Sequence, residues 1–433
     1  MKHPKMKYTY VGVDSHKETH YVVAIDCFFE KLGEIEFMNY PGNFNEALKE
    51  IEKLKVESTH LMFGLEDVSA YGRSLAVFLL NRKYKVKHVN ASLVAHERKS
   101  RNVLHKTDSE DALCSARVLL NRFSSLPDAN PQDKFYLLTN LVARRRLIVK
   151  MNTSLKNHIQ SYIIIHYPRY NKFFENFDCK TSLLFYKKYP SPRKLQETNI
   201  DELTDFLEEH SKKRFRRKKA EAIFKIVKQD GDTSTKFQEE REKIICSGVR
   251  QLHNNNTELE NIDSLLESFL DEFPYKLTSM SGIDTVIASS LIAEIGDIER
   301  FSTPSKLARY AGVSPVTYAS GKSEVHYSNE RGNRVLNSIF FKLSVLVTMK
   351  AGKNNKIVNS YFYEYYQRKI SEGKTKKQAL KCVQRRLVNI IWGMMKHKTE
   401  YINPPTQSTW ISAFLSYIIN FRNIDNRIKN LTY

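Results

Sequence analysis

The sequence predicts a mixed α/β domain at the amino-terminal end and a mainly α-helical remainder. In the first 125 residues, short apolar runs typical of strands alternate with patterns of helical period. From Asp133 onward, long stretches carry apolar residues three and four positions apart and contain few glycines. At 433 residues and 41% hydrophobic content, the chain is long enough for two or three domains with real cores.

The amino-terminal elements follow from their patterns in order along the chain. Strands are expected at 8–17, 20–27, 34–40, 60–66 and 85–90, and helices at 43–55, 72–83 and 107–123. The first three strands follow one another at hairpin spacing. The order β-β-β-α-β-α-β-α is that of the ribonuclease H-like fold, in which parallel strands reached through helices extend an antiparallel meander.

The helical remainder begins with a long pattern at 133–166 and resumes with another at 236–273, and we expect these two helices to pair. The region between them, 166–232, is less regular. Its segment 211–228 holds nine Lys or Arg residues and one Glu. Such a run is often a solvated helix face, but so many like charges favour contact with nucleic acid.

The overall charge narrows the class of partner. The chain has 69 Lys and Arg against 48 Asp and Glu, a formal net charge of +21, which favours a polyanionic partner over a merely soluble basic surface. No apolar stretch approaches the roughly 18 residues of a membrane span, and no secretory segment precedes the first strand, so we expect a cytoplasmic protein without a membrane partner. The five cysteines are scattered and form no CxxC pair, so we expect them to be reduced, structural residues.

Four acidic residues stand where expected strands or helices end or begin. Asp14 closes the first strand and Glu66 the fourth, while Asp108 and Asp111 lie one turn apart on the last helix. If the two strands are neighbours, the four carboxylates could hold one or two Mg²⁺ ions, which prefer oxygen ligands. Taken singly, Asp14 could cap a turn, Glu66 could join a surface pair and Asp108 could be a helix N-cap.

Several motifs resemble a known family. The segments VGVDSHK, GLEDVSAYG and HKTDSEDA resemble the N-terminal domain of the DEDD transposases of bacterial insertion sequences in the "insertion sequence one-ten" family. That domain is similar to the Holliday-junction resolvase RuvC. The segments that begin SGIDTVIASSLIAEIG and SNERGNRVLN look like the family's C-terminal transposase domain. The two matches cover about 8–125 and 275–345, in the family's order.

The resemblance implies a reaction and a set of roles. It implies that Asp14, Glu66, Asp108 and Asp111 bind Mg²⁺ and that Ser320 is the nucleophile that forms a phosphoserine link with DNA. Ser314 and Ser323 lie close enough in sequence to be misregistered candidates for that role. It further implies target and donor DNA selected by an element-encoded bridge RNA, a homodimer or homotetramer in the synaptic complex, and a bacterial cytoplasmic location at the nucleoid.

The expected domains and backbone contacts complete the prediction. The domains are a RuvC-like catalytic domain at 1–127, a helical coiled-coil region with a basic insertion at 128–272, a domain with the catalytic serine at 273–352, and a basic, aromatic-rich helical tail at 353–433. The residues expected to contact nucleic acid, with a solvated charged face as the alternative, are Lys99, Arg101, Lys106, Arg144, Arg145, Arg146, Arg214, Arg216, Arg217 and Lys322.

Two other functions remain open from the residues. One is a structure-specific endonuclease that uses only the four carboxylates, with water as the nucleophile. The other is a nucleic-acid-binding protein without catalytic activity. Loss of a covalent protein–DNA adduct on replacing Ser320 separates the transposase from the endonuclease.

Overall fold

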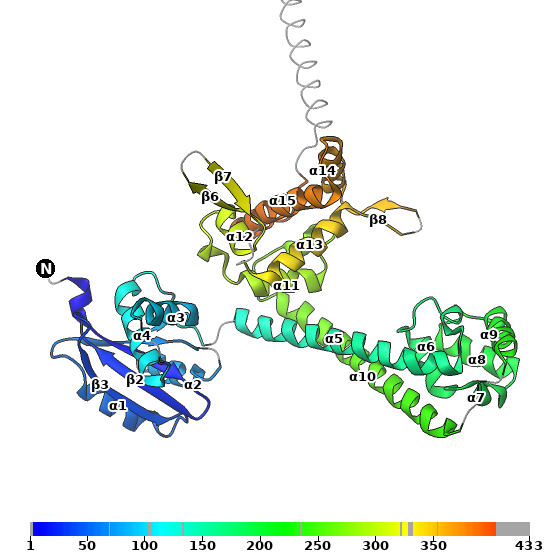
Figure 1. The fold of residues 1–433 in the computed structure, drawn as a ribbon, viewed down its shortest axis with the longest axis horizontal. Helices are drawn as coiled ribbons and strands as arrows, with labels where there is room; N and C mark the ends of the chain where they lie inside the picture. Colours follow the sequence, from blue (N-terminus) through cyan, green and yellow to red (C-terminus); the bar gives the residue numbers. More distant parts are fainter. Residues whose placement is uncertain are drawn as a thin grey trace, which may run out of the picture. The chain divides into compact units, whose positions relative to one another are not determined.

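A computed structural model shows the fold. It describes residues 3–403 apart from 69, 103–104, 132–133, 232, 234–235, 321–322, 328–331 and 353, and for the rest of 316–331 it gives the backbone only. The chain divides into two compact units, Met1–Tyr136 and Leu137–Tyr433 (Figure 1).

The first unit is built on a five-stranded sheet. Its strand order is β3-β2-β1-β4-β5, with β2 antiparallel to its neighbours β1 and β3, and β4 parallel to its neighbours β1 and β5. The elements are β1 (Tyr8–Ser15), β2 (Thr19–Ile25), β3 (Lys31–Met38), α1 (Phe44–Lys53), β4 (His60–Leu65), α2 (Arg73–Asn81), β5 (Lys85–His88), α3 (Ala91–Ser100) and α4 (Asp108–Arg122).

Every strand and helix expected in this region is present, and the structure adds one α-helix and a short 3-10 helix at Pro4–Lys7. The helix α3, which the sequence analysis missed, begins after Asn90, whose side chain accepts a hydrogen bond from the backbone N–H of Ser92. Its apolar signal is weak because Val94 is the one buried residue within it. The condition on which the acidic residues would converge is met, since β1 and β4 are parallel neighbours.

The sheet is buried on both faces. Val11, Val13 and Phe63 point to one face and pack against α1 and α2, while Tyr10 and Met62 point to the other and pack against α4. This is the alternation that a strand with a period of two produces. Both faces of β1 therefore belong to the hydrophobic core.

Two glycines let α4 approach the sheet closely. Gly12 of β1 and Gly64 of β4 are partners in register. A Cβ added at Gly12 would lie 2.1 Å from the carbonyl oxygen of Ala112 and 2.3 Å from the amide nitrogen of Ala116, so no side chain fits there. The hydroxyl of Ser115 donates to the carbonyl of Gly64 at 3.2 Å. The backbone of α4 thus lies directly on the centre of the sheet.

The second unit begins with two long helices, α5 (Lys134–His166) and α10 (Gln238–Leu270). Arg145 donates to Asp263, and Asn152 donates to Asn256. Because the contact on α10 moves back by seven residues as the contact on α5 advances by seven, the helices run antiparallel. These contacts confirm the expected pairing.

A helical module is inserted between α5 and α10. It contains α6 (Lys180–Lys188), α7 (Pro192–Gln196), α8 (Ile200–His210) and α9 (Arg217–Asp230). Its core is rich in aromatic rings and also takes in Ile163 of α5 and Ile245 and Val249 of α10. Hence the region 166–232, which looked irregular in sequence, is a packed domain-like module.

The remainder of the second unit is mainly helical, as expected, with two short hairpins that the sequence analysis did not predict. Its elements are α11 (Thr285–Ile295), α12 (Pro304–Tyr310), β6 (Val316–Ser320), β7 (Ser323–Tyr327), α13 (Arg334–Thr348), β8 (Lys350–Ala351), β9 (Lys356–Ile357), α14 (Ser360–Ser371) and α15 (Lys376–His397). Among the described helices, none combines the length and hydropathy needed to cross a membrane.

A carboxylate cluster as candidate active site

The sheet brings two of the expected carboxylates to one edge. Asp14 lies near the end of β1, and Glu66 follows the last residue of β4. Their preceding residues, Val13 and Leu65, are partners in the parallel register. Neighbouring parallel strands end at the same edge, so the carboxylates of Asp14 and Glu66 emerge side by side.

The helix α4 adds the other two. Its first residue is Asp108, and the hydroxyl of Thr107, the N-cap, accepts a hydrogen bond from the backbone N–H of Glu110. Asp111 lies one turn further on and is buried, with 7% of its surface exposed. Because α4 is seated on Gly12 of β1, its first turn lies over the end of that strand. All four expected acidic residues therefore lie at one edge of the sheet.

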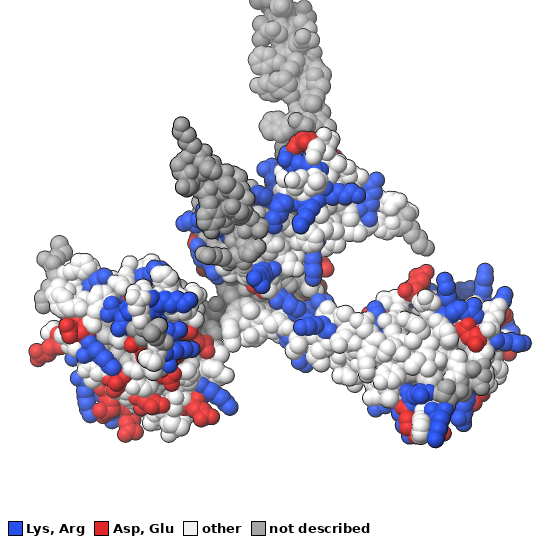
Figure 2. All heavy atoms as spheres, viewed as in Figure 1, with Lys and Arg blue, Asp and Glu red and all other residues white. Residues whose placement is uncertain are grey.

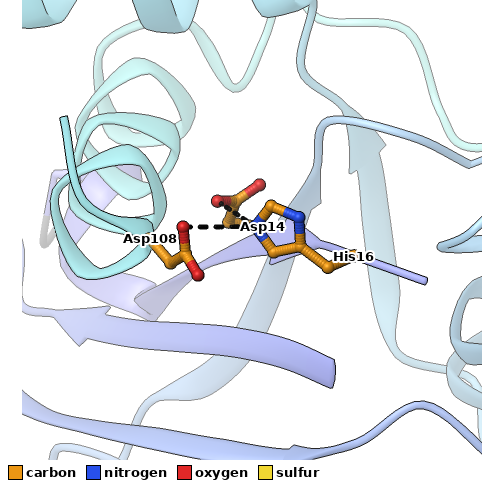
Figure 3. A group of neighbouring side chains, drawn as sticks. All are labelled: Asp14, His16 and Asp108. Carbon is orange, nitrogen blue, oxygen red and sulfur yellow. Dashed lines mark hydrogen bonds and ion pairs between the residues drawn. The ribbon is translucent and has the colours of Figure 1, made fainter. Parts of the chain in front are cut away.

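A histidine that the sequence analysis did not single out joins them. His16 Nε2 lies 3.1 Å from Asp14 Oδ2 and 3.3 Å from Asp108 Oδ1, so the imidazole lies between the two carboxylates (Figure 3). One ligand atom from each of these three residues lies within 4.8 Å of the others. His16 could have been identified from the sequence by its position two residues after Asp14. In an extended chain, this spacing places both side chains on the same side.

Burial and the proximity of like charges shift the pKa values of two carboxylates in the site. Burial raises the pKa of Asp14, and the charges of Asp111 and Asp108 raise it further, while His16 opposes the shift. Burial also raises the pKa of Glu66, with Asp14 and Asp111 adding to the effect. Both carboxylates therefore ionise less readily than they would in water.

Two basic residues partly offset the negative charge. Arg98 of α3 donates a hydrogen bond to Asp111 Oδ1, and Lys106 Nζ lies 3.8 Å from Asp111 Oδ2. Both cations act against the rise in the pKa of Glu66. Arg98 was not recognised in the sequence because it lies on the missed helix α3.

The donor set fits a divalent cation. Carboxylate oxygens are the ligands that hard cations prefer, and a doubly charged ion among them would relieve the repulsion that raises the pKa of Asp14 and Glu66. An imidazole nitrogen is an additional ligand for several transition metals. The cluster therefore has the chemistry of a metal-dependent active site.

The residues expected to contact nucleic acid in the first unit differ in their surroundings. Lys99 is exposed, and Lys106 lies beside the acidic cluster as described. Arg101 instead pairs with Glu110 of α4 and also approaches the thiol of Cys114 at 3.8 Å. Arg101 thus helps to hold α3 against α4.

Within the second unit, several of the expected contacts are engaged in ion pairs. Arg145 forms a two-point pair with Asp263, at 2.5 and 3.0 Å, and Arg146 Nη2 lies 3.4 Å from Glu294 Oε1. Arg144 is exposed.

In the inserted module, Arg214 Nη2 lies 3.6 Å from Glu175, and Arg217 pairs with Asp201 and Glu221. The Nε of Arg216 donates to the backbone carbonyl of Lys213 at 3.4 Å.

The remaining two candidates are Ser320 and Lys322. Ser320 is the last residue of β6, and its backbone pairs with Ser323 of β7. Its side chain and the whole of Lys322 lie outside the described residues. The hairpin belongs to the second unit, whereas the carboxylate cluster belongs to the first.

Comparison with known proteins agrees with this combination of a DEDD-type acidic site and a helical remainder. Residues 11–168 match the DEDD transposase model of the IS110 type, described as a transposase, and residues 275–367 match the model described as Transposase IS116/IS110/IS902 family.

Full-length relatives show the same kinship. The chain is 24% identical over 404 residues to an uncharacterised 44.8 kDa protein of insertion element IS116 from Streptomyces clavuligerus, covering 92% of this chain and 96% of that protein. It is 22% identical over 401 residues to the pilin gene-inverting protein of Moraxella bovis, covering 92% and 98%. The chain thus belongs to the IS110 family of DNA transposases.

Proposed function

We propose that the protein is a Mg²⁺-dependent recombinase that cuts and rejoins target and donor DNA, with a ribonuclease H-like, RuvC-like first unit. The observation that carries this proposal is the convergence of Asp14, Glu66, Asp108 and Asp111 at one edge of the sheet, where burial and mutual repulsion raise the pKa of two of them. The strand order β3-β2-β1-β4-β5, antiparallel then parallel, supports the fold assignment.

The residues of the site have distinct roles in this proposal. Asp14, Glu66, Asp108 and Asp111 hold the metal, and Arg98 orients Asp111 by donating to Oδ1. When bound, Mg²⁺ supplies Lewis-acid stabilisation of the charge that develops on the phosphate. Lys106, with its side chain 73% exposed, is available to contact the DNA backbone beside the cluster.

Ser320 supplies the attacking oxygen in the preferred mechanism. Its Oγ forms a bond to a backbone phosphorus as the bond from that phosphorus to one DNA oxygen breaks, and the hydroxyl proton is transferred to the departing oxygen. The energy of the broken bond is retained in the phosphoserine link, so rejoining needs no ATP. Family membership supports this assignment, as does the relative named for inverting a pilin gene.

Selection of the DNA and assembly belong to the same proposal. An element-encoded bridge RNA would choose target and donor by base pairing, and a homodimer or homotetramer would form the synaptic complex. The chain's excess of basic residues, with a net charge of +21, supports binding of such polyanions.

Trapping of the covalent intermediate tests the proposal. Wild-type protein incubated with radiolabelled donor and target DNA, Mg²⁺ and the transcript of the flanking element should give a protein–DNA adduct on a denaturing gel. Ser320→Ala should give none, while Ser323→Ala, a change of the same size in the same hairpin, should retain it. Cleavage undiminished in Ser320→Ala would instead establish a water nucleophile and a resolvase-like endonuclease.

The metal site is tested separately from the nucleophile. Asp14→Asn and Asp108→Asn should abolish adduct formation and strand exchange while DNA binding in a filter assay persists. Strand exchange by both variants at the wild-type rate would exclude the cluster as the catalytic site. Omitting the RNA tests guidance, since exchange without any RNA would remove that part of the proposal.

A further inference from the structure

The inserted module has a concave basic surface that none of the expected contacts includes. A cavity of about 430 Å³ opens where the end of α6, the helix α7 and the first half of α10 meet. Two acidic residues, Glu239 and Glu242, contribute to its lining. Its six basic lining residues are Lys187, Lys188, Arg193, Lys194, Lys243 and Arg250. The lining therefore has a net excess of four positive charges.

Within the part of the chain that the structure describes, most of these cations have no ion-pair partner. Of the six, only Lys194 pairs with a carboxylate among the described residues, that of Glu197 at 3.0 Å. Elsewhere in the module, Arg214 and Arg217 have carboxylate partners. Lys188 lies over the rings of Tyr189 and Phe206, at 5.2 and 4.8 Å from their centroids. The charges of Lys187, Arg193, Lys243 and Arg250 are thus available to a ligand.

The floor of the cavity is a buried polar network. Glu242 is 8% exposed; it accepts a hydrogen bond of 2.5 Å from the hydroxyl of Ser191 and one of 3.4 Å from Gln238. Gln238 lies 3.0 Å from Nδ1 of the buried His166, at the end of α5. This network holds α5, α7 and α10 together, so the carboxylate of Glu242 is committed to the floor and the basic side chains remain at the opening.

Helix geometry fixes the spacing of the cations on α10. Glu239, Glu242, Lys243, Cys246 and Arg250 recur at intervals of three and four and so share one face of the helix. Lys243 and Arg250 lie seven residues apart, about 10.5 Å along the axis. Both are exposed. The two side chains thus form a row along α10, with the lysines of α6 and the α7 residues on the opposite wall.

We infer that this cavity binds the phosphodiester backbone of a nucleic acid strand. Lysine and arginine with no acidic partner, arranged in a row along a groove, neutralise successive phosphates, whereas the cavity offers no exposed aromatic platform for bases. Figure 2 shows Lys and Arg side chains, with Asp and Glu among them, over the surface of the module. The site belongs to the second unit and contains none of the four carboxylates of the cluster, so its role is to hold nucleic acid.

The experiment measures binding by the full-length protein and needs no catalysis. A fluorescein-labelled 30-nucleotide single strand, made both as DNA and as RNA, is titrated with protein at several salt concentrations. Lys243→Gln combined with Arg250→Gln should weaken binding and reduce the slope of log affinity against log salt by about 1.4, since a single strand contributes about 0.7 per neutralised phosphate. The double variant Lys243→Arg with Arg250→Lys should keep the wild-type slope.

The matched control changes charge by the same amount in the other unit. Lys53 and Lys55 are paired with Glu50 at 2.6 Å and Glu52 at 3.2 Å, and the double variant to Gln should leave the slope unchanged. A loss confined to RNA or to DNA identifies the strand that the cavity holds. Equal slopes for the cavity variant and the control on both strands would overturn the inference, whatever the recombination assays show.

Cys246 provides a second readout from inside the cavity. It is partly exposed, and its thiol lies 3.5 Å from the backbone carbonyl of Lys187. A bound strand should slow its alkylation by maleimide, followed by mass spectrometry, in the wild type but not in the Lys243→Gln, Arg250→Gln variant. Alkylation at the same rate with and without a saturating strand would contradict binding in the cavity.

Discussion

The carboxylate cluster of the first unit and the basic cavity of the second hold like charges in opposite circumstances. In the cluster, the sheet edge and α4 force Asp14, Glu66 and Asp111 together in partly buried positions, and burial and repulsion raise the pKa of the first two. In the cavity, the basic groups at the opening, such as Lys243 and Arg250, are exposed to water.

This difference in burial distinguishes a site suited to catalysis from a site suited to binding. Crowding carboxylates away from water destabilises the fold, so such a cluster is maintained where its chemistry requires it. Exposed cations cost the fold little stability. They attract phosphates through electrostatic interactions that salt screens, and each contributes a small, additive amount to the binding free energy. Changes at the cluster should therefore have large, specific effects, and changes at the cavity should have graded effects that depend on salt.

The largest effect is expected at Glu66. Glu66→Gln removes one charge from a residue proposed to hold the metal, and strand cleavage should fall by more than about 100-fold, beyond the range typical of residues that only support a ligand. Glu36→Gln, the same change at an exposed position on β3, should leave cleavage near the wild-type rate. Initial rates of donor cleavage measure both, and equal rates in the two variants would remove Glu66 from the site.

A smaller effect is expected from the residue that positions Asp111. Arg98→Met should lower the cleavage rate by roughly 10- to 100-fold, because Asp111 loses the donor that orients it. Arg117 also lies between α3 and α4 but pairs with Glu97 at 3.0 Å, outside the cluster. Arg117→Met is the matched control. A higher Mg²⁺ requirement in Arg98→Met alone supports positioning, and equal losses in both variants would indicate a general effect on packing.

An intermediate change in stability is expected at His20, which packs against Phe37 and Phe44 in the core of the first unit. Burial lowers its pKa to about 4. The unfolded chain therefore binds a proton that the folded chain does not between about pH 6.5 and pH 4. Stability contributed by neutral His20 is complete above pH 6.5 and is lost as the pH falls through this window, by about 3 kcal/mol.

Denaturation in urea at several pH values measures this loss. His20→Leu should flatten the fall in stability between pH 6.5 and pH 4. The exposed His60 of β4 provides the control, and His60→Leu should keep the wild-type pH dependence. A fall that persists unchanged in His20→Leu would assign it to another group.

The smallest effect is expected on stability at Asp14, where the substitution that removes activity should stabilise the fold. Because the pKa of Asp14 is raised, its ionised form destabilises the fold increasingly as the pH rises from about 3.8 through the raised value. At neutral pH without divalent metal, Asp14→Asn should therefore stabilise the protein. Thermal melts should show Mg²⁺ raising the midpoint of the wild type and not that of the variant, and a less stable variant would contradict the repulsion inferred here.

The sequence predicted what depends on local pattern. The ends of the first and fourth strands and the start of the 107–123 helix placed Asp14, Glu66, Asp108 and Asp111 correctly, because strand order in this arrangement makes those ends converge. It did not reveal Arg98, whose helix has a weak apolar signal, and it passed over His16.

The sequence did not reveal ion-pair partners that are distant along the chain, for a different reason. Arg145 and Asp263 are 118 residues apart in sequence and meet only because α5 and α10 run antiparallel. Arg217 meets Asp201 across the fold of the inserted module. A basic run on its own does not show which of its charges are already neutralised. The cavity with Lys187 and Arg250 likewise forms only when α6 and α10 pack together.

Gly12 allows the helix α4 to approach the strand β1 closely beside the carboxylate cluster. The backbone of α4 occupies the space where a Cβ of residue 12 would be, so only the hydrogen of a glycine fits there. This contact fixes the distance between β1, which bears Asp14, and α4, which bears Asp108 and Asp111. Even alanine at position 12 would act as a wedge between the two halves of the site. An inactivating change could thus arise at a residue that carries no functional group at all.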